Sequence, residues 1–275
     1  MNLTQSQFSI WMGQKLNPDA PLYNMVHVFS IHGSLNVDHF KAAFQKLIQN
    51  TDALRTVFYE KDNRPEQHVL PTIDYDMSYL DFNGKNETQI FNWIKERSQK
   101  DFELSEVLFD SVLLKISDQE YRWYLNIHHL ITDATSSTIL YEYMSSYYKK
   151  INTGIRDDFE AIPNFESFLD YESKSILSEK SESIRAYWKQ KLEGLNKSIT
   201  LYGNKGDYKT TKSKRVVIEL NPERLDKLNE ISLLPEVRSW SKDLTYFNIF
   251  CTILFVFLKR VSNANTIIIG APSHN

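Results

Sequence analysis

Ile127-His128-His129-Leu130-Ile131-Thr132-Asp133-Ala134 is the stretch that decides the fold, because a strand pattern ends in it and a helix pattern begins. Residues 121–127 form a strong apolar strand pattern, and residues 135–150 have apolar side chains at helical spacing. Asp133 or Thr132 is the expected N-cap of that helix. A junction of this kind holds side chains rigidly while exposing them, so it is the first place to look for chemistry.

The two adjacent histidines indicate proton handling rather than metal binding. Histidine changes its protonation state near neutral pH. Neighbouring residues on a strand point to opposite faces, so His128 and His129 are poorly placed to hold one metal ion, and we expect no metal site. One ring should face the interior and the other a cleft. From the residues alone, a catalytic role for His129 and a hydrogen-bonded structural role remain equally open.

Strand and helix patterns alternate outward from this junction. We expect strands at residues 25–31, 108–116, 215–220 and 266–270, and a hairpin around Asp62-Asn63. Helices are expected at residues 5–16, 37–49, 88–100, 165–175, 182–192, 222–233 and 245–261, the last of them buried. The alternation predicts a mixed α/β architecture that divides somewhere near residues 156–165.

Composition excludes several classes of function. The 275 residues carry a net charge of −3 without a basic stripe, which argues against nucleic acid and against an anionic membrane surface. The N-terminus lacks the pattern of a signal peptide, and the apolar run 246–257 is too short to span a bilayer. Cys251, the single cysteine, permits no intrachain disulfide and should be a buried thiol. We therefore expect a cytoplasmic protein.

Several motifs occur along the whole chain in the order of one known family. The string His128-His129-x-x-x-Asp133 resembles the HHxxxDG signature of the nonribosomal peptide synthetase condensation domain, a member of the chloramphenicol acetyltransferase-like superfamily. Further segments resemble the family's other motifs: Ser6-Gln7-x-x-x-Trp11, Asp52-Ala53-Leu54-Arg55-Thr56-Val57-Phe58, Phe102 to Phe109, Asn164 to Tyr171 with Tyr187-Trp188, and Ile269-Gly270-Ala271-Pro272-Ser273-His274-Asn275.

This resemblance implies a two-lobed α/β fold of the chloramphenicol acetyltransferase type. Lobe one would cover residues 1–160, and residues 161–275 would begin a second lobe that is incomplete at the fifth motif. The implied reaction is acyl or peptidyl transfer that forms an amide between substrates tethered as thioesters. The implied partners are a donor and an acceptor carrier protein, whose phosphopantetheine arms hold the substrates. No cofactor is expected on this chain.

The resemblance also assigns roles to residues. His129 would be the cleft-facing catalytic histidine, either as general base or as a positioning group, and His128 would be largely structural. Asp133 would form a buried ion pair with Arg55 that organises the loop. Ala134 stands where the family usually has glycine, so it keeps the backbone amide but requires an allowed φ, and an oxyanion role there is in doubt.

Other readings remain open beside condensation. One is a sister enzyme on the same fold, either an epimerisation domain or a coenzyme A-dependent acyltransferase. The Thr135-Ser136-Ser137 sequence after the aspartate favours condensation, because epimerisation domains usually have Ser-Trp there. Another is a non-catalytic carrier-binding fragment. Because well over a third of a full domain is missing, we expect either a truncated protein or completion by self-association.

Overall fold

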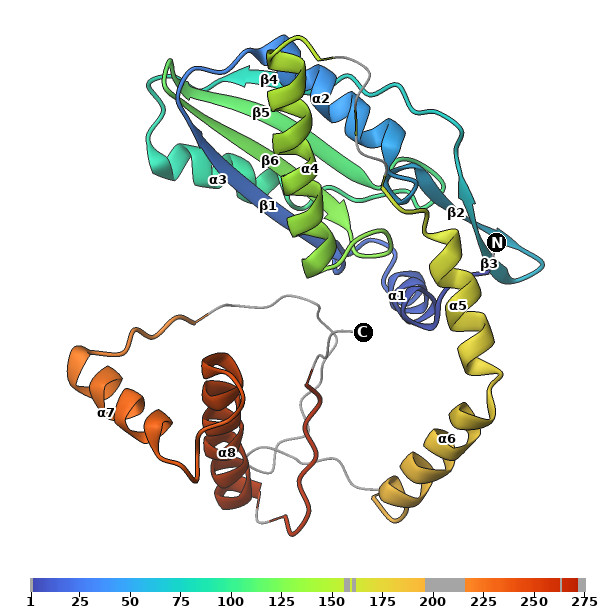
Figure 1. Ribbon diagram of the computed structural model, residues 1–275, viewed down its shortest axis with the longest axis vertical. Helices are drawn as coiled ribbons and strands as arrows, with labels where there is room; N and C mark the ends of the chain where they lie inside the picture. Colours follow the sequence, from blue (N-terminus) through green and yellow to red (C-terminus); the bar gives the residue numbers. More distant parts are fainter. Residues whose placement is uncertain (1, 156–158, 160–161, 196–215, 263, 272–275) are drawn as a thin grey trace. The chain divides into compact units, whose positions relative to one another are not determined.

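A computed structural model describes the chain except for residues 1, 156–158, 160–161, 196–215, 263 and 272–275 (Figure 1). It divides into two compact units, Met1–Arg185 and Ala186–Asn275. Both helices and strands are present, and the mixed α/β prediction is confirmed. The division expected near residue 160 as a lobe boundary stays a prediction, since the first unit also includes the next helix.

The first unit is built on a four-stranded sheet in the order β1-β6-β5-β4. The strands are β1 (Asn24–His32), β4 (Ser78–Asp81), β5 (Phe109–Ser117) and β6 (Glu120–His128). β6 pairs antiparallel with both β1 and β5, while β4 and β5 are parallel and are joined through helix α3 (Glu87–Arg97). The strand that leads to the histidines therefore lies inside the sheet, with a hydrogen-bonded neighbour on each side.

Helices cover both faces of this sheet (Figure 1). α2 (Val37–Asn50) and α4 (Ala134–Asn152) pack on one face, where Phe44 and Leu140 join Trp123 of β6 in the larger core. α3 packs on the other face, with Ile90 against Tyr124. Every buried large apolar side chain in the described part of the chain lies between Trp11 and Tyr147. The packed core is thus confined to the first unit.

The first unit also contains an N-terminal helix and a separate two-stranded hairpin. Helix α1 (Gln5–Leu16) begins with a capping box at Thr4. The hairpin of β2 (Thr56–Lys61) and β3 (Arg64–Val69) follows the short 3₁₀ helix η1 (Ala53–Arg55). It turns at Asp62 and Asn63, where the sequence predicted a hairpin, and their φ angles of 52° and 59° are those of a type I′ turn.

Along the chain follow helices α5 (Glu166–Ile176) and α6 (Glu179–Leu192), and the division after Arg185 falls within α6; the second unit also contains α7 (Pro222–Leu233) and α8 (Lys242–Ser262). The strand expected at residues 266–270 is absent, and residues 216–220 of the other expected strand are irregular too, with Val217 and Ile218 about three-quarters exposed. Residue 215 lies outside the described residues. A strand needs a hydrogen-bonded neighbour, and the described second unit offers none, so apolar alternation alone does not form a sheet.

Helix α8 differs from its prediction in length and in burial. It has 21 residues, which is long and apolar enough to cross a membrane by length and composition. A single helix of this kind is weak evidence, because core helices of soluble proteins share these properties. Only Thr245 is fully buried, Cys251 is partly exposed, and Phe250 and Ile253 are more than half exposed, so the predicted burial is wrong within this unit.

Candidate functional site

The two histidines lie where β6 ends and α4 begins. β6 ends at His128, and α4 starts at Ala134. Asp133 is the N-cap, as predicted, and its Oδ1 accepts a hydrogen bond from the Ser136 amide at 2.7 Å. The loop between β6 and α4 is therefore fixed at one end by the sheet and at the other by the N-cap of α4.

His128 is a buried, neutral ring that ties the loop to its surroundings. Only 1% of the residue is exposed. Its Nδ1 accepts from the Leu130 amide at 3.1 Å, so the ring hydrogen is on Nε2, which faces Gln14 Oε1 at 3.4 Å. Burial, and to a lesser degree the neighbouring His129, lowers the pKa of His128 to about 4. The ring is thus uncharged at neutral pH.

His129 is partly exposed and is held in one orientation. Its backbone amide donates to the Tyr23 carbonyl at 2.8 Å. Its ring Nδ1 lies 2.7 Å from the Thr132 carbonyl oxygen, which can only accept, so Nδ1 carries the hydrogen. In the neutral ring the lone pair is then on Nε2, and within the described residues no protein group bonds to that atom. This arrangement can accept a proton from a bound amine.

The expected ion pair between Asp133 and Arg55 is not formed. The Arg55 guanidinium donates to backbone carbonyls, with Nε bonded to Ile48 and Nη1 to Leu70 and Pro71. Arg55 directly precedes the hairpin, so its side chain closes the ends of β2 and β3 rather than reaching the histidine loop. The structure therefore gives Arg55 backbone acceptors, and a role for this residue in organising the histidine loop stays a prediction.

Ala134 occupies the first position of α4. Its φ lies outside the left-handed region, where only Asp62 and Asn63 occur among the described non-glycine residues. A glycine is therefore not required here, and alanine keeps the backbone amide at a helix start, where the first amides have no intrahelical partner. Whether that amide contacts a substrate stays a prediction.

Three glutamines contribute contacts at the site that the sequence did not predict. Gln7 and Gln14 on α1 bond to Leu130 and His128, and Gln67 on β3 bonds to Gln7. All three side chains are buried. Gln7 lies in one of the motifs quoted above, but nothing in a single sequence shows that its partner is 123 residues away.

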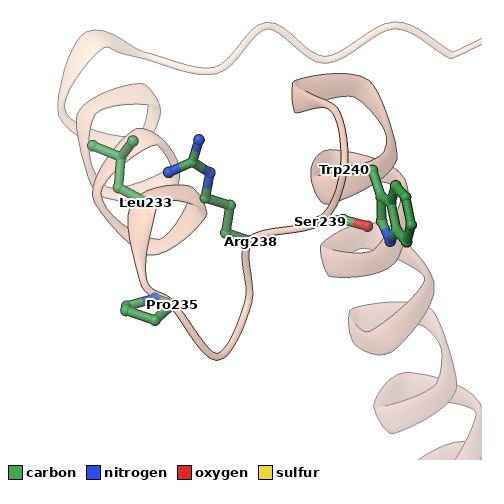
Figure 2. Close-up of a pocket in the computed structure, with 5 residues that line it drawn as sticks. All are labelled: Leu233, Pro235, Arg238, Ser239 and Trp240. Atoms are coloured by element: carbon green, nitrogen blue, oxygen red, sulfur yellow. The ribbon is translucent and has the colours of Figure 1, made fainter.

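A hollow described on the chain lies away from the histidines. In the second unit, the loop between α7 and α8 encloses about 490 Å³ lined by Leu233, Pro235, Arg238, Ser239 and Trp240. Figure 2 shows the Arg238 side chain near Leu233 and the Trp240 ring at the start of α8. It contains no nucleophile beside a base, so the histidine junction remains the stronger site. Of the fifth motif, residues 272–275 lie outside the described residues.

Comparison with known protein families gives one match along the whole length. Residues 1–275 match the family model described as Condensation domain. Among curated proteins, a component of the linear gramicidin synthase of Brevibacillus parabrevis is 26% identical over 98% of the chain, which covers 4% of that protein. The dimodular nonribosomal peptide synthase of Bacillus subtilis is 22% identical over 98% of the chain and 11% of its own length. The chain therefore spans a small part of these relatives.

Solved structures show the same fold. The first condensation domain of the calcium-dependent antibiotic synthetase matches 97% of the chain and 62% of its own, with a TM-score of 0.76 and 20% identity. The starter condensation domain of rhizomide synthetase matches 69% of the chain and 49% of its own, with a TM-score of 0.63 and 25% identity. The predicted fold class is confirmed, and the chain spans about half to three-fifths of each solved domain.

Proposed function

Because the chain belongs to the condensation domain family, we propose that it takes part in amide-bond formation between two carrier-tethered thioesters in nonribosomal peptide synthesis. The observation that carries the proposal is the His129 ring. It is partly exposed, its Nδ1 hydrogen is engaged by the Thr132 carbonyl, and its Nε2 lone pair is available. That is the state in which an imidazole removes a proton from an attacking amine.

The proposed step is an acyl transfer. The acceptor's amine nitrogen attacks the donor thioester carbonyl, the carbon–sulfur bond breaks, and the donor's phosphopantetheine thiolate leaves. His129 Nε2 takes the proton that the nitrogen loses and returns it to the thiolate. General base catalysis of this kind contributes roughly 10²–10⁴-fold, and orienting two tethered substrates can contribute more.

We propose phosphopantetheine-bearing carrier proteins as donor and acceptor partners, with no cofactor on this chain. A mutant of the rhizomide starter domain has been solved in complex with C8-CoA and Leu-SNAC, which is an acyl thioester together with an aminoacyl thioester. That protein is 24% identical to this one, so the pairing supports a substrate class here without naming an acyl chain or an amino acid.

The test is amide formation from a chemically loaded donor and acceptor carrier pair. It compares the 275-residue chain with a version that carries the remainder of the second lobe, each with and without His129→Ala. Loss of about 10² or more in turnover on His129→Ala is expected. The matched control is His32→Ala, which removes an exposed histidine from the end of β1. Turnover that survives His129→Ala would remove His129 from the reaction and favour a carrier-binding fragment.

We also propose that the apolar face of α8 is covered in the working protein by further polypeptide of the second lobe. Exposed Phe250 and Ile253 form part of that face, and the solved domains are longer than this chain. The isolated chain should then self-associate through α8. Light scattering should give a mass above 32.3 kDa that falls on Phe250→Ser/Ile253→Ser. A monodisperse monomer at tens of micromolar would contradict the proposal.

A further inference from the structure

The side chain of Gln7 uses all of its hydrogen-bonding capacity inside the first unit. Its Oε1 accepts from the Thr4 amide at 3.0 Å and from Gln67 Nε2 at 3.2 Å. Its Nε2 donates to the Leu130 carbonyl and to Gln67 Oε1, both at 3.1 Å. An amide offers two donors and one oxygen with two lone pairs, so Gln7 is saturated. A buried amide satisfied in this way has one permitted position.

These bonds join three separate elements at the residue after His129. Thr4 caps α1, Gln67 lies on β3, and Leu130 follows His129 in the loop. Gln67 is 1% exposed and also donates to the Asn2 carbonyl at 2.8 Å. The Leu130 amide is held from the opposite side by His128 Nδ1. Both polar groups of the Leu130 residue are therefore bonded to buried side chains.

We infer that Gln7 is a positioning residue, which fixes the loop so that the Thr132 carbonyl meets Nδ1 of His129. The inference rests on the proposed function for His129. The physical reason is that the ring's tautomer depends on the 2.7 Å bond to Thr132, which closes a loop of only three residues. If the Leu130 carbonyl loses its donor, it becomes an unsatisfied buried acceptor, and the loop must move to satisfy it.

The test measures the ¹⁵N chemical shifts of the two His129 ring nitrogens in the whole chain, at a pH above the usual range of imidazole pKa values. In the unsubstituted protein, the two ring nitrogens should give well-separated shifts, with the hydrogen on Nδ1. In Gln7→Met, which keeps the length but removes the donor, the two shifts should move toward a common value as the ring exchanges tautomers. In a turnover assay, kcat should fall roughly tenfold to a hundredfold while KM changes little.

Gln67→Met is the matched control. It removes two of the four hydrogen bonds of Gln7 but leaves the bond from Gln7 to Leu130, so it should lower the melting temperature and change the His129 shifts much less than Gln7→Met does. If Gln7→Met does not fold, Gln7→Glu replaces it, because a carboxylate still accepts from Thr4 but cannot donate to Leu130. Unchanged His129 shifts in the Gln7 variant, or equal changes in both variants, would refute the inference. The NMR result needs no turnover, so it is independent of whether the proposed reaction is right.

Discussion

Acidification should destabilise the first unit through His128, because this ring is buried without a charge. The folded protein holds it neutral, with Nδ1 bonded to Leu130 and a pKa of about 4. In the unfolded chain, a histidine titrates near 6.5. At a pH between these two pKa values, the His128 ring binds a proton in the unfolded state but not in the folded state.

The sign and size of the effect follow from linkage. Since the unfolded state binds more protons, stability rises with pH, with a slope of up to about 1.4 kcal/mol per pH unit. The contribution is complete above about pH 6.5 and is lost as the pH falls toward 4. Over the whole interval the free energy of unfolding should fall by about 3 kcal/mol, a large fraction of the stability of one domain.

The assay is urea denaturation of the full chain, monitored by the fluorescence of the core aromatic residues. It is repeated at steps of about half a pH unit between roughly pH 7.5 and 4, the range in which His128 should change the stability. Other groups titrate in the same range, including His27, whose pKa burial also lowers. The difference between the protein and His128→Asn therefore isolates one ring, since asparagine keeps a polar group near the position of Nδ1. Equal pH slopes in the two proteins, or a His128 NMR titration near 6.5, would refute the reasoning.

Two further predictions concern ion pairs. A double-mutant cycle of Arg55→Met with Asp133→Asn should give a coupling energy below about 0.5 kcal/mol in urea unfolding, because Arg55 bonds to backbone carbonyls and not to Asp133. A coupling energy of about 1 kcal/mol or more would instead support the ion pair between Asp133 and Arg55 that the sequence predicted. Arg97→Met should lower the free energy of unfolding by about 2–3 kcal/mol, measured by thermal unfolding. Arg97 bonds to the Asp110 carboxylate at 2.7 and 2.9 Å, and that carboxylate is only 4% exposed. Without Arg97, its remaining ion-pair partner among the described residues is the more distant Lys100. The control Glu87→Gln breaks an ion pair with an exposed carboxylate and should cost under about 1 kcal/mol, so equal losses would contradict this account.

Local patterns were sufficient to predict most of the first unit. The helical spacing of Phe40, Phe44 and Leu47 predicted α2, and Asp62-Asn63 predicted the hairpin turn. The cap at Asp133 followed from residue type and position. Each of these features depends on neighbours within a few residues, which a single sequence displays directly.

Features that depend on distant partners were predicted less well. Residues 216–220 and 266–270 have the apolar patterns that are typical of strands. A strand forms, however, only where another chain segment offers hydrogen bonds. Arg55 had plausible acceptors both on the loop and in the hairpin, and only the folded geometry selects between them. The link from Gln7 to Leu130 has the same character, because it joins α1 to a loop far along the sequence.

The confinement of the fully buried core to residues from Trp11 to Tyr147, within the described part of the chain, has a consequence for synthesis on the ribosome. Once the first unit has emerged from the exit tunnel, all the side chains that fix His128 and His129 are present, so this unit can fold while α8 is still being translated. A nascent chain stalled after Arg185 should already resist protease at the histidine loop. The apolar surface of α8 is then synthesised only after the first unit can fold, so the unfolded segments of the first unit do not meet that surface.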